Sequence, residues 1–489
     1  MNMMITKIVS LLMESEETVS PYPKSYTTIG DTHFLMVALR CTRMMAIYGK
    51  GPSFHDFEGE LLDQDLKLCP LSHDNRLMMN KYFQHTLPSA FGSQAATFGV
   101  GDRLGHATPG HVNIISRSGA KPVLAQQSKR ELTLTGRTYR DVLDDVAFAV
   151  FQEGYTGGFG ADGDHLKEED DIAEALSLGY SMITLDCSEK MGHGVEALSP
   201  EELEKLFNKY PAALRKRWEN NYWEKRFPIG DQSIDFSPEE LMHNALLYND
   251  AIAFIMDIYR RLILPCGRAI DFEVSLDETE SATTLQGHLF VAEEISQGGV
   301  SLTSLAPRFV GEFQKGIDYI GNLTDFDENL KAHAQIADHY GYKISVHSGS
   351  DKFSLYPSIS RHTRQRLHVK TSGTSWLEAV ALMAQINPRL YRRIHQCALD
   401  NFAKAQAYYH VGADVLKVTN LNQVDDDHLI DYFSDPNARQ LLHITFGFIL
   451  GTPDLKEPLF QSLFDHAPLY AERLEKHIGK HLSLLNVFK

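Results

Sequence analysis

Short apolar runs that end in small or polar residues recur along the chain from about residue 97 onward. Each run spans roughly 4–8 residues or a little more and is rich in β-prone side chains, the pattern of a strand buried in a parallel sheet. The runs cover residues 97–102, 123–128, 155–162, 182–187, 269–279, 307–313, 344–349 and 367–373. The pattern therefore predicts eight strands.

Helical patterns lie between several of these runs. Residues 327–340 have acidic side chains in their first turn and stop before Gly341, and residues 138–151 and 281–296 are similar. Strands that alternate with helices are typical of the α/β class, and eight of them predict a (β/α)8 TIM-type barrel. A doubly wound open sheet is the competing architecture. The barrel is preferred because the count fits and no dinucleotide glycine fingerprint opens the chain.

The pattern divides the chain into three parts. Residues 1–95 carry no clear periodicity and are predicted to be an N-terminal elaboration or cap. Residues 96–375 are predicted to hold the barrel, and residues 376–489 are mainly helical and are expected to pack on it. About eighty residues separate the fourth and fifth runs, and residues 195–265 among them predict a helical insertion.

The composition narrows the class of protein. The formal net charge is −17, and no block of Lys and Arg stands against it, so no nucleic-acid partner is expected. There is no run of about 18 apolar residues, so no membrane span is predicted, and the N-terminal pattern is not that of a signal peptide. Five cysteines without a CxxC pair are typical of a reducing compartment, which predicts a cytoplasmic protein.

Functional side chains of a barrel lie at the C-terminal ends of its strands and in the loops that follow. Three good ligands for a divalent cation stand at such positions: His165, Glu312 and His347. Two imidazoles and a carboxylate suit Zn, Mn, Co or Ni and leave positions open for water or substrate oxygens. Asp186 and His368 are reserve ligands by the same reasoning. The chain is therefore predicted to bind a divalent metal cation.

Acidic residues of the third and fifth runs are candidates for acid–base chemistry. They are Asp162, Asp164, Glu273, Asp277 and Glu278. An acid and a base that straddle one reacting carbon should come from different strands. Asp164 and a glutamate of the fifth strand meet this condition. Strand alternation places Glu273 and Asp277 on one face and Glu278 on the other.

Other polar residues at the strand ends are predicted to contact a substrate. The predicted substrate-binding residues are Asp102, Arg103, Gln127, Asp186, Lys352, His368 and Lys370. The two lysines and the arginine carry the positive charge that would hold an anion, and a guanidinium fits a carboxylate best. Walker, GxSxG and HExxH motifs are absent from the sequence, so no nucleotide cofactor is expected.

Five long motifs resemble the tagaturonate epimerase family. They are FGVGDRLG (98–105), FGADGDHLK (159–167), AIDFEVSLDET (269–279), ISVHSGSDKFS (344–354) and HVKTSGTSWLEA (368–379). The resemblance spans most of the chain from about residue 95 onward. Motifs of this length are far more specific than a single set of metal ligands.

The resemblance implies a metal-dependent enzyme that interconverts D-tagaturonate and D-fructuronate, with relatives that also act on the neutral ketoses D-fructose and D-tagatose. Carried over by position, Asp164 is similar to the family's proton acceptor. The implied metal ligands are His165, Glu312 and His347. Glu273 is taken as the proton donor in preference to Glu278.

The two ketouronates differ at C4 in ketose numbering, the carbon β to the ketone. Because the carbonyl does not acidify the proton on that carbon, simple enolisation cannot invert it. Retro-aldol cleavage and re-addition, with the metal as Lewis acid, is the expected route. The alternatives are a metal-dependent sugar isomerase or ketose 3-epimerase that works through an enediol, and a non-catalytic sugar-binding protein. The sequence leaves open whether copies of the chain form a homo-oligomer.

Overall fold

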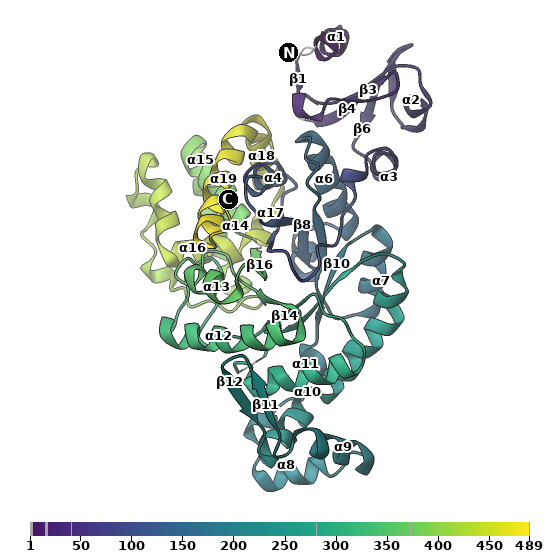
Figure 1. Ribbon diagram of the computed structural model, residues 1–489. Helices are drawn as coiled ribbons and strands as arrows, with labels where there is room; N and C mark the ends of the chain where they lie inside the picture. The colour runs from purple at the N-terminus through teal and green to yellow at the C-terminus, as the bar shows by residue number, and fades with distance from the viewer. Residues whose placement is uncertain (1–2, 15–17, 41, 280, 372, 489) are drawn as a thin grey trace.

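A closed barrel of parallel strands forms the centre of the computed structural model, which describes residues 3–14, 18–40, 42–279, 281–371 and 373–488 (Figure 1). The strands are β7 (Thr97–Val100), β8 (Lys121–Ser128), β9 (Gly160–Leu166), β10 (Met182–Asp186), β13 (Asp271–Leu276), β14 (Ser304–Pro307), β15 (Lys343–Val346) and β16 (Leu367–Thr371). They follow one another around the barrel in chain order, and β16 closes on β7. The predicted (β/α)8 fold is confirmed.

Strand β13 shows why these strands hold both apolar and charged residues. All six of its residues are buried. Phe272 packs on Tyr259 outside the barrel, so the alternating partner Glu273 points into the barrel interior. The outward face therefore supplies the apolar core, while the interior is lined by polar side chains that need partners.

Helices cover the outside of the barrel. They include α4 (Thr108–Ile115), α5 (Lys129–Thr135), α6 (Tyr139–Gln152), α7 (Glu169–Leu178), α11 (Leu285–Gln297), α12 (Leu323–Tyr340) and α13 (Tyr356–Thr363). Helix α12 ends where the sequence predicts, because Gly341 takes a left-handed φ of 81°. In the described ranges, none of the helices combines the length and the apolar character that crossing a membrane requires.

Two of the predicted strands are shifted along the chain. The third was expected over 155–162, but β9 begins at Gly160, after Gly158 turns the chain with a φ of 79°, and it continues to Leu166. The sixth was expected over 307–313, but β14 ends at Pro307. Residues beyond it enter a loop in which Gly311 has a φ of 81° and Glu312 pairs with Ile320. Both errors come from apolar residues in loops that continue a strand-like pattern.

The N-terminal segment forms an antiparallel sheet that the sequence analysis did not predict. The strands are β1 (Val19–Pro21), β2 (Thr27–Ile29), β3 (Thr32–Leu39), β4 (Thr42–Tyr48), β5 (Glu60–Asp63) and β6 (Leu66–Pro70). One face is covered by α1 (Met3–Leu12). The other face packs Phe34 against Phe83, which meets Phe151 of α6. Aromatic contacts therefore join this sheet to the barrel's helical layer.

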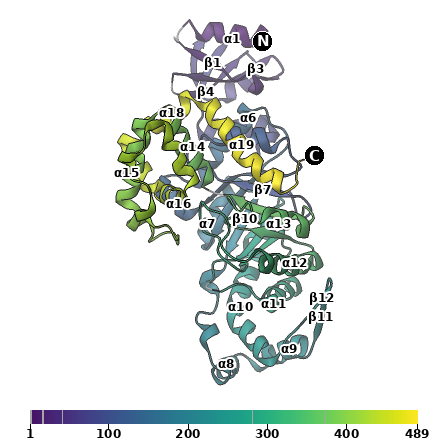
Figure 2. The same cartoon turned by 90° about the vertical axis from the view of Figure 1, so that its left-hand side faces the viewer.

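The chain between β10 and β13 contains helices and one unpredicted hairpin. The helices are α8 (Pro200–Phe207), α9 (Ala212–Tyr222) and α10 (Pro238–Ile258). The hairpin pairs β11 (Arg226–Ile229) with β12 (Gln232–Asp235), and Gly230 makes its tight turn with a φ of 62°. Figures 1 and 2 place α8 and α9 at the end of the molecule opposite the N-terminal sheet.

After β16 the chain is helical and builds a second core beside the barrel (Figure 2). Its main helices are α14 (Thr374–Ile386), α15 (Pro388–Ala405), α16 (Pro436–Ile444), α17 (Phe446–Leu450), α18 (Pro453–Asp465) and α19 (Ala467–Leu484). Arg103, after β7, joins this layer to the barrel. It forms an ion pair with Glu131 of α5, and its guanidinium lies 3.7 Å from the ring centroid of Phe446.

A buried histidine lies in this helical layer. His395 on α15 is fully buried, and its Nδ1 lies 3.1 Å from the hydroxyl of Tyr391. Its ring also meets the edge of Tyr432 at 4.6 Å between centroids. The imidazole therefore has aromatic surroundings. Among the described residues, no carboxylate pairs with it to stabilise a positive charge.

We expect His395 to make the stability of the protein depend on pH. Burial lowers the pKa of this imidazole from 6.5 to about 4, so between these values the unfolded chain binds a proton that the folded chain does not. Above about pH 6.5 the burial of His395 costs no stability through protonation. As the pH falls from there toward 4, the folded state loses roughly 1.4 kcal/mol of stability per pH unit. His395→Gln should reduce this slope in urea unfolding. A slope that changes equally in the neighbouring surface variant Gln396→Ala would contradict the assignment.

Candidate active site

Lys370 lies at the centre of a buried cluster of carboxylates inside the barrel. Its Nζ lies 2.7 Å from an oxygen of Asp162, 2.7 Å from an oxygen of Asp164 and 3.1 Å from Oε1 of Glu273. The cluster joins strands β9, β13 and β16. Strand alternation turns both Asp162 and Asp164 of β9 to the barrel interior. Thr184 of β10 also donates to Asp162 and Glu273.

The charges of this cluster shift one another's pKa values. Burial alone would lower the pKa of Lys370, but Asp162, Asp164 and Glu273 raise it well above its ordinary value. Burial would raise the pKa of Asp164, yet Lys370 and His165 hold it below its usual range. For Asp162, burial wins and raises the pKa to about 6. At neutral pH the cluster therefore holds a charged lysine and ionised Asp164 and Glu273.

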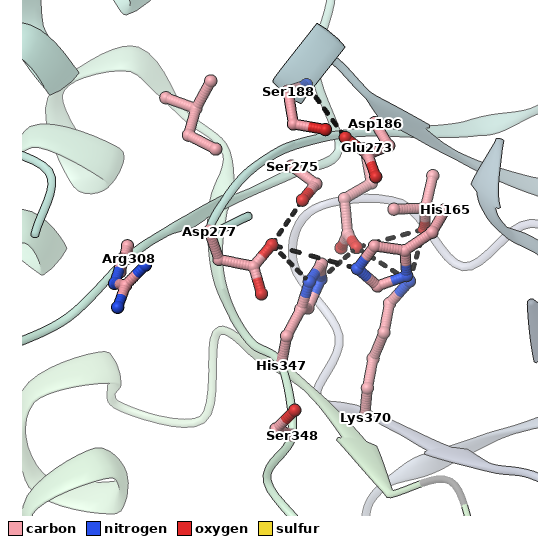
Figure 3. A network of polar contacts seen from close by, with 12 residues as sticks. His165, Asp186, Ser188, Glu273, Ser275, Asp277, Arg308, His347, Ser348 and Lys370 are labelled. Atoms are coloured by element: carbon pink, nitrogen blue, oxygen red, sulfur yellow. Dashed lines mark hydrogen bonds and ion pairs between the residues drawn. The ribbon is translucent and has the colours of Figure 1, made fainter. Parts of the chain in front are cut away.

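Two histidines and an aspartate stand at the mouth of the barrel next to this cluster (Figure 3). His347 Nδ1 lies 3.0 Å from Oδ1 of Asp277, and His165 Nε2 lies 3.9 Å from the same oxygen. The two imidazole rings meet edge to face at 4.7 Å between centroids. His165 has a left-handed φ of 54°, and this strained backbone at the strand end directs its side chain.

These three residues fit a divalent cation. One donor atom from each of His165, Asp277 and His347 lies within 4.8 Å of the others. Two imidazoles and a carboxylate are a ligand set of Zn and related metals. The surroundings favour positive charge: burial would lower the pKa values of both imidazoles, but neighbouring carboxylates, Asp164 for His165 and Asp277 for His347, raise them.

The contacts of His165 and His347 link the cation-binding group to the lysine cluster. His347 Nε2 lies 2.8 Å from Oε1 of Glu273, and His165 Nδ1 lies 2.9 Å from Oδ1 of Asp164. Each of the two candidate histidine ligands thus contacts one of the two predicted acid–base carboxylates. The structure brings together Asp164, His165, Glu273, His347 and Lys370 as the sequence analysis expected.

Glu312, the third ligand expected from the sequence, is not within this group of three but lines a cavity that Asp277 and His347 also line. It is exposed in the loop after β14, and its carboxylate accepts a hydrogen bond from Nε2 of Gln314 at 2.6 Å. Asp277, directly after β13, is the carboxylate that lies beside the two histidines. From the sequence alone, Asp277 is only an acid–base candidate. Glu278, the alternative proton donor, is exposed and lines the cavities beside the site.

Two of the predicted substrate-binding cations and one carboxylate hold loops in place. Arg103 forms the ion pair with Glu131 described above. Lys352 donates to the backbone carbonyls of Gln314 at 2.8 Å and Ile317 at 2.7 Å, and burial lowers its pKa to about 7. Asp102 accepts backbone hydrogen bonds, including that of Ala107 at 2.7 Å. These groups are committed to backbone partners or to a buried ion pair.

The remaining candidates lie at different depths. His368 is buried beneath the site with Nδ1 2.8 Å from Oγ1 of Thr97, and burial lowers its pKa to about 3. Asp186 accepts from the backbone of Ser188 at 2.9 Å and lines a cavity. Alternation turns Gln127 away from the barrel interior, and its neighbour Gln126 lines the cavity instead.

Two adjoining cavities open beside the site. One has a volume of about 1120 Å³ and the other of about 360 Å³, and both are lined by Asp277 and His347. The smaller one reaches Asp164, His165 and Lys370. The larger one is lined by Arg308, which the sequence analysis missed because the sixth strand was placed too late. A correct strand end at Pro307 would have pointed to it.

Comparisons with known proteins identify close relatives. The sequence profile of a family described as tagaturonate epimerase matches residues 22–485. The tagaturonate/fructuronate epimerase of Thermotoga maritima is 42% identical over 469 residues, which cover 95% of this chain and 96% of the relative. Crystal structures of the fructuronate-tagaturonate epimerase from Cohnella laeviribosi, native and with one glycerol, are 45% identical. They align with a TM-score of 0.95 over 99% of this chain and 100% of theirs.

We expect Lys370→Met to destabilise the protein by about 3–5 kcal/mol, because it leaves buried carboxylates without their cation. Adding Asp164→Asn to that variant should raise its urea unfolding midpoint, since one uncompensated negative charge is removed. The same Asp164→Asn change alone should lower the midpoint, because it weakens the partner set of Lys370. If Asp164→Asn has the same sign in both backgrounds, the charge balance described here is wrong.

Proposed function

Because the chain belongs to the tagaturonate epimerase family, we propose that it interconverts D-tagaturonate and D-fructuronate by inverting C4 of the ketouronate. The activity is that of an isomerase. The observation that carries the proposal is the contact of each candidate metal-binding histidine with one acid–base carboxylate, His165 with Asp164 and His347 with Glu273. A site that only bound sugar hydroxyls would not need two buried, ionised carboxylates around a lysine.

The proposed cofactor is a divalent cation such as Zn, Mn, Co or Ni. His165, Asp277 and His347 would hold it, with Asp277 in the role that the sequence assigned to Glu312. When bound, such a cation supplies Lewis-acid chemistry that stabilises negative charge on the ketone oxygen. The carboxylates Asp164 and Glu273 remain next to the histidines for proton transfer.

In the proposed reaction, Asp164 removes the proton of the C4 hydroxyl. The C4 oxygen becomes an aldehyde carbonyl as the C3–C4 bond breaks, and the electron pair of that bond moves into an enediolate of C1 to C3. The C4–C6 aldehyde then turns its other face, and the enediolate carbon attacks it to reform the bond. The proton that Asp164 took passes through Lys370 to Glu273, which delivers it to the new C4 alkoxide. The product is the C4 epimer, and both carboxylates are ionised again.

Lys370 supports this exchange of protons between the two carboxylates. Its Nζ contacts both Asp164, at 2.7 Å, and Glu273, at 3.1 Å. The ammonium group lowers the pKa values of both carboxylates against the effect of burial, so both are ionised at neutral pH. A shared lysine also lets the two carboxylates exchange roles in the reverse direction, as microscopic reversibility requires.

The first test is an NMR assay with D-fructuronate, D-tagaturonate and D-fructose. We expect C4 epimerisation that is lost on chelation and restored by one of the four metals. Asp277→Asn should weaken metal binding, measured directly by titration calorimetry, whereas Glu312→Gln should leave it within about threefold. Glu273→Gln should lower kcat at least about 10²-fold with metal binding retained. No epimer with any metal would refute the proposed function.

The second test distinguishes bond cleavage from proton abstraction. D-fructuronate that carries deuterium on C4 should give D-tagaturonate with its label retained, because the C4–H bond is never broken in the retro-aldol route. Loss of the C4 label to solvent would show abstraction at C4. Exchange of solvent deuterium into C3 of the product would favour the alternative enzyme, an isomerase or 3-epimerase that forms an enediol.

A further inference from the structure

We infer that Arg308 binds the carboxylate of the hexuronate and thereby selects the sugar acid over the neutral ketose. The inference rests on the proposed function, because it names the residue that recognises the charged end of that substrate. A ketohexuronate has its ketone and its carboxylate near opposite ends of a six-carbon chain. With the ketone beside His165, Asp277 and His347, the carboxylate must meet positive charge elsewhere in the cavity.

Four of the cations near the acid–base carboxylates already have carboxylate partners. Lys370 contacts Asp162, Asp164 and Glu273. Lys129 pairs with Asp171, and Lys167 lies 3.0 Å from Glu189. Arg103, which the sequence suggested for this role, is buried in its pair with Glu131. A substrate carboxylate would have to displace an existing partner at each of these positions.

Arg308 differs from them because its guanidinium is uncommitted. Within the described part of the chain it forms no ion pair and no side-chain hydrogen bond. Its backbone is fixed, since its N–H donates to Oγ1 of Thr283 at 2.9 Å and its carbonyl accepts from the N–H of Thr283 at 2.9 Å. The position follows Pro307, the last residue of β14, where a barrel places its functional side chains.

The side chain of Arg308 lies in the appropriate part of the site. It lines the larger cavity together with Asp277 and His347. In the view of Figure 3, Asp277 lies between Arg308 and Lys370. A substrate with its ketone at Asp277 would therefore have cavity space on the side of Arg308. A guanidinium offers two parallel N–H donors that match the two oxygens of a carboxylate.

Two other cations line the same cavity and serve as comparisons. Lys315 donates to Oγ of Ser348 at 3.0 Å, and Arg130 donates to the backbone carbonyl of Tyr408 at 3.0 Å. Both therefore have partners, although neither partner is a carboxylate. Their variants report the effect of removing one positive charge from the cavity without removing the proposed carboxylate contact.

The proposed retro-aldol route gives Arg308 a second consequence. After cleavage, the C4–C6 fragment is an aldehyde that still carries the carboxylate, and it must turn without leaving. Arg308 would hold the carboxylate while the aldehyde end turns. If the fragment escapes, the enediolate takes a proton from water and is released as dihydroxyacetone, together with the three-carbon aldehyde acid. Both products are visible by NMR.

The experiment compares kcat/KM for D-fructuronate and D-fructose in the metal-loaded protein. We expect Arg308→Ala to lower the value for fructuronate about 10²-fold, mainly through KM, and to change that for fructose less than about threefold. Arg308→Lys should recover part of the loss. Lys315→Ala and Arg130→Ala should change the ratio of the two values less than tenfold.

Ligand binding is measured as a second test, because it does not require activity on fructose. Titration of D-gluconate and D-sorbitol, an anionic and a neutral six-carbon polyol, should show that Arg308→Ala removes the preference for the anion. The inference is overturned if this variant keeps its preference, or if it loses activity on both sugars equally. Wild-type protein that binds gluconate but epimerises neither uronate would refute the proposed function and leave the anion contact standing.

Discussion

The buried contact of Lys370 with Asp162, Asp164 and Glu273 is the interaction on which the site depends. Carboxylates and an ammonium group inside a barrel are costly to bury, and they remain ionised only because each has its partner within hydrogen-bond distance. Strands β9, β13 and β16 must therefore keep their register for the charges to balance. The apolar layer between the barrel and its helices supplies the packing that fixes that register.

The same charges determine what the mouth of the barrel can bind. The excess of carboxylates over lysine creates a place that favours cations, and His165, Asp277 and His347 surround it. Positive charge returns farther out, at Arg308, on the wall of the larger cavity. The site thus runs from the buried carboxylate cluster to the guanidinium of Arg308, on a wall that also carries Glu196 and Glu312. A molecule with electron-rich oxygens at one end and a carboxylate at the other matches this arrangement.

The sequence predicted the barrel and most of its central residues, because eight buried strands and the polar residues that end them leave a clear pattern. Asp164, His165, Glu273, His347 and Lys370 were found in this way. Which group each charged side chain contacts was not predictable from one sequence. Nothing local shows that Arg103 meets Glu131 or that Lys352 meets the backbone of a neighbouring loop. Strands β1, β2, β11 and β12 escaped because they have only three or four residues and are partly buried. That reason does not apply to β3, which is eight residues long and mostly buried.

Lys352 has a consequence for how a substrate enters. By binding the carbonyls of Gln314 and Ile317, it ties the loop after β15, which follows His347, to the loop after β14, which follows Arg308. Residues of both loops line the larger cavity, so Lys352 couples the positions of His347 and Arg308. A sugar that enters this cavity therefore meets the candidate metal ligand and the candidate anion contact on two loops that are tied together.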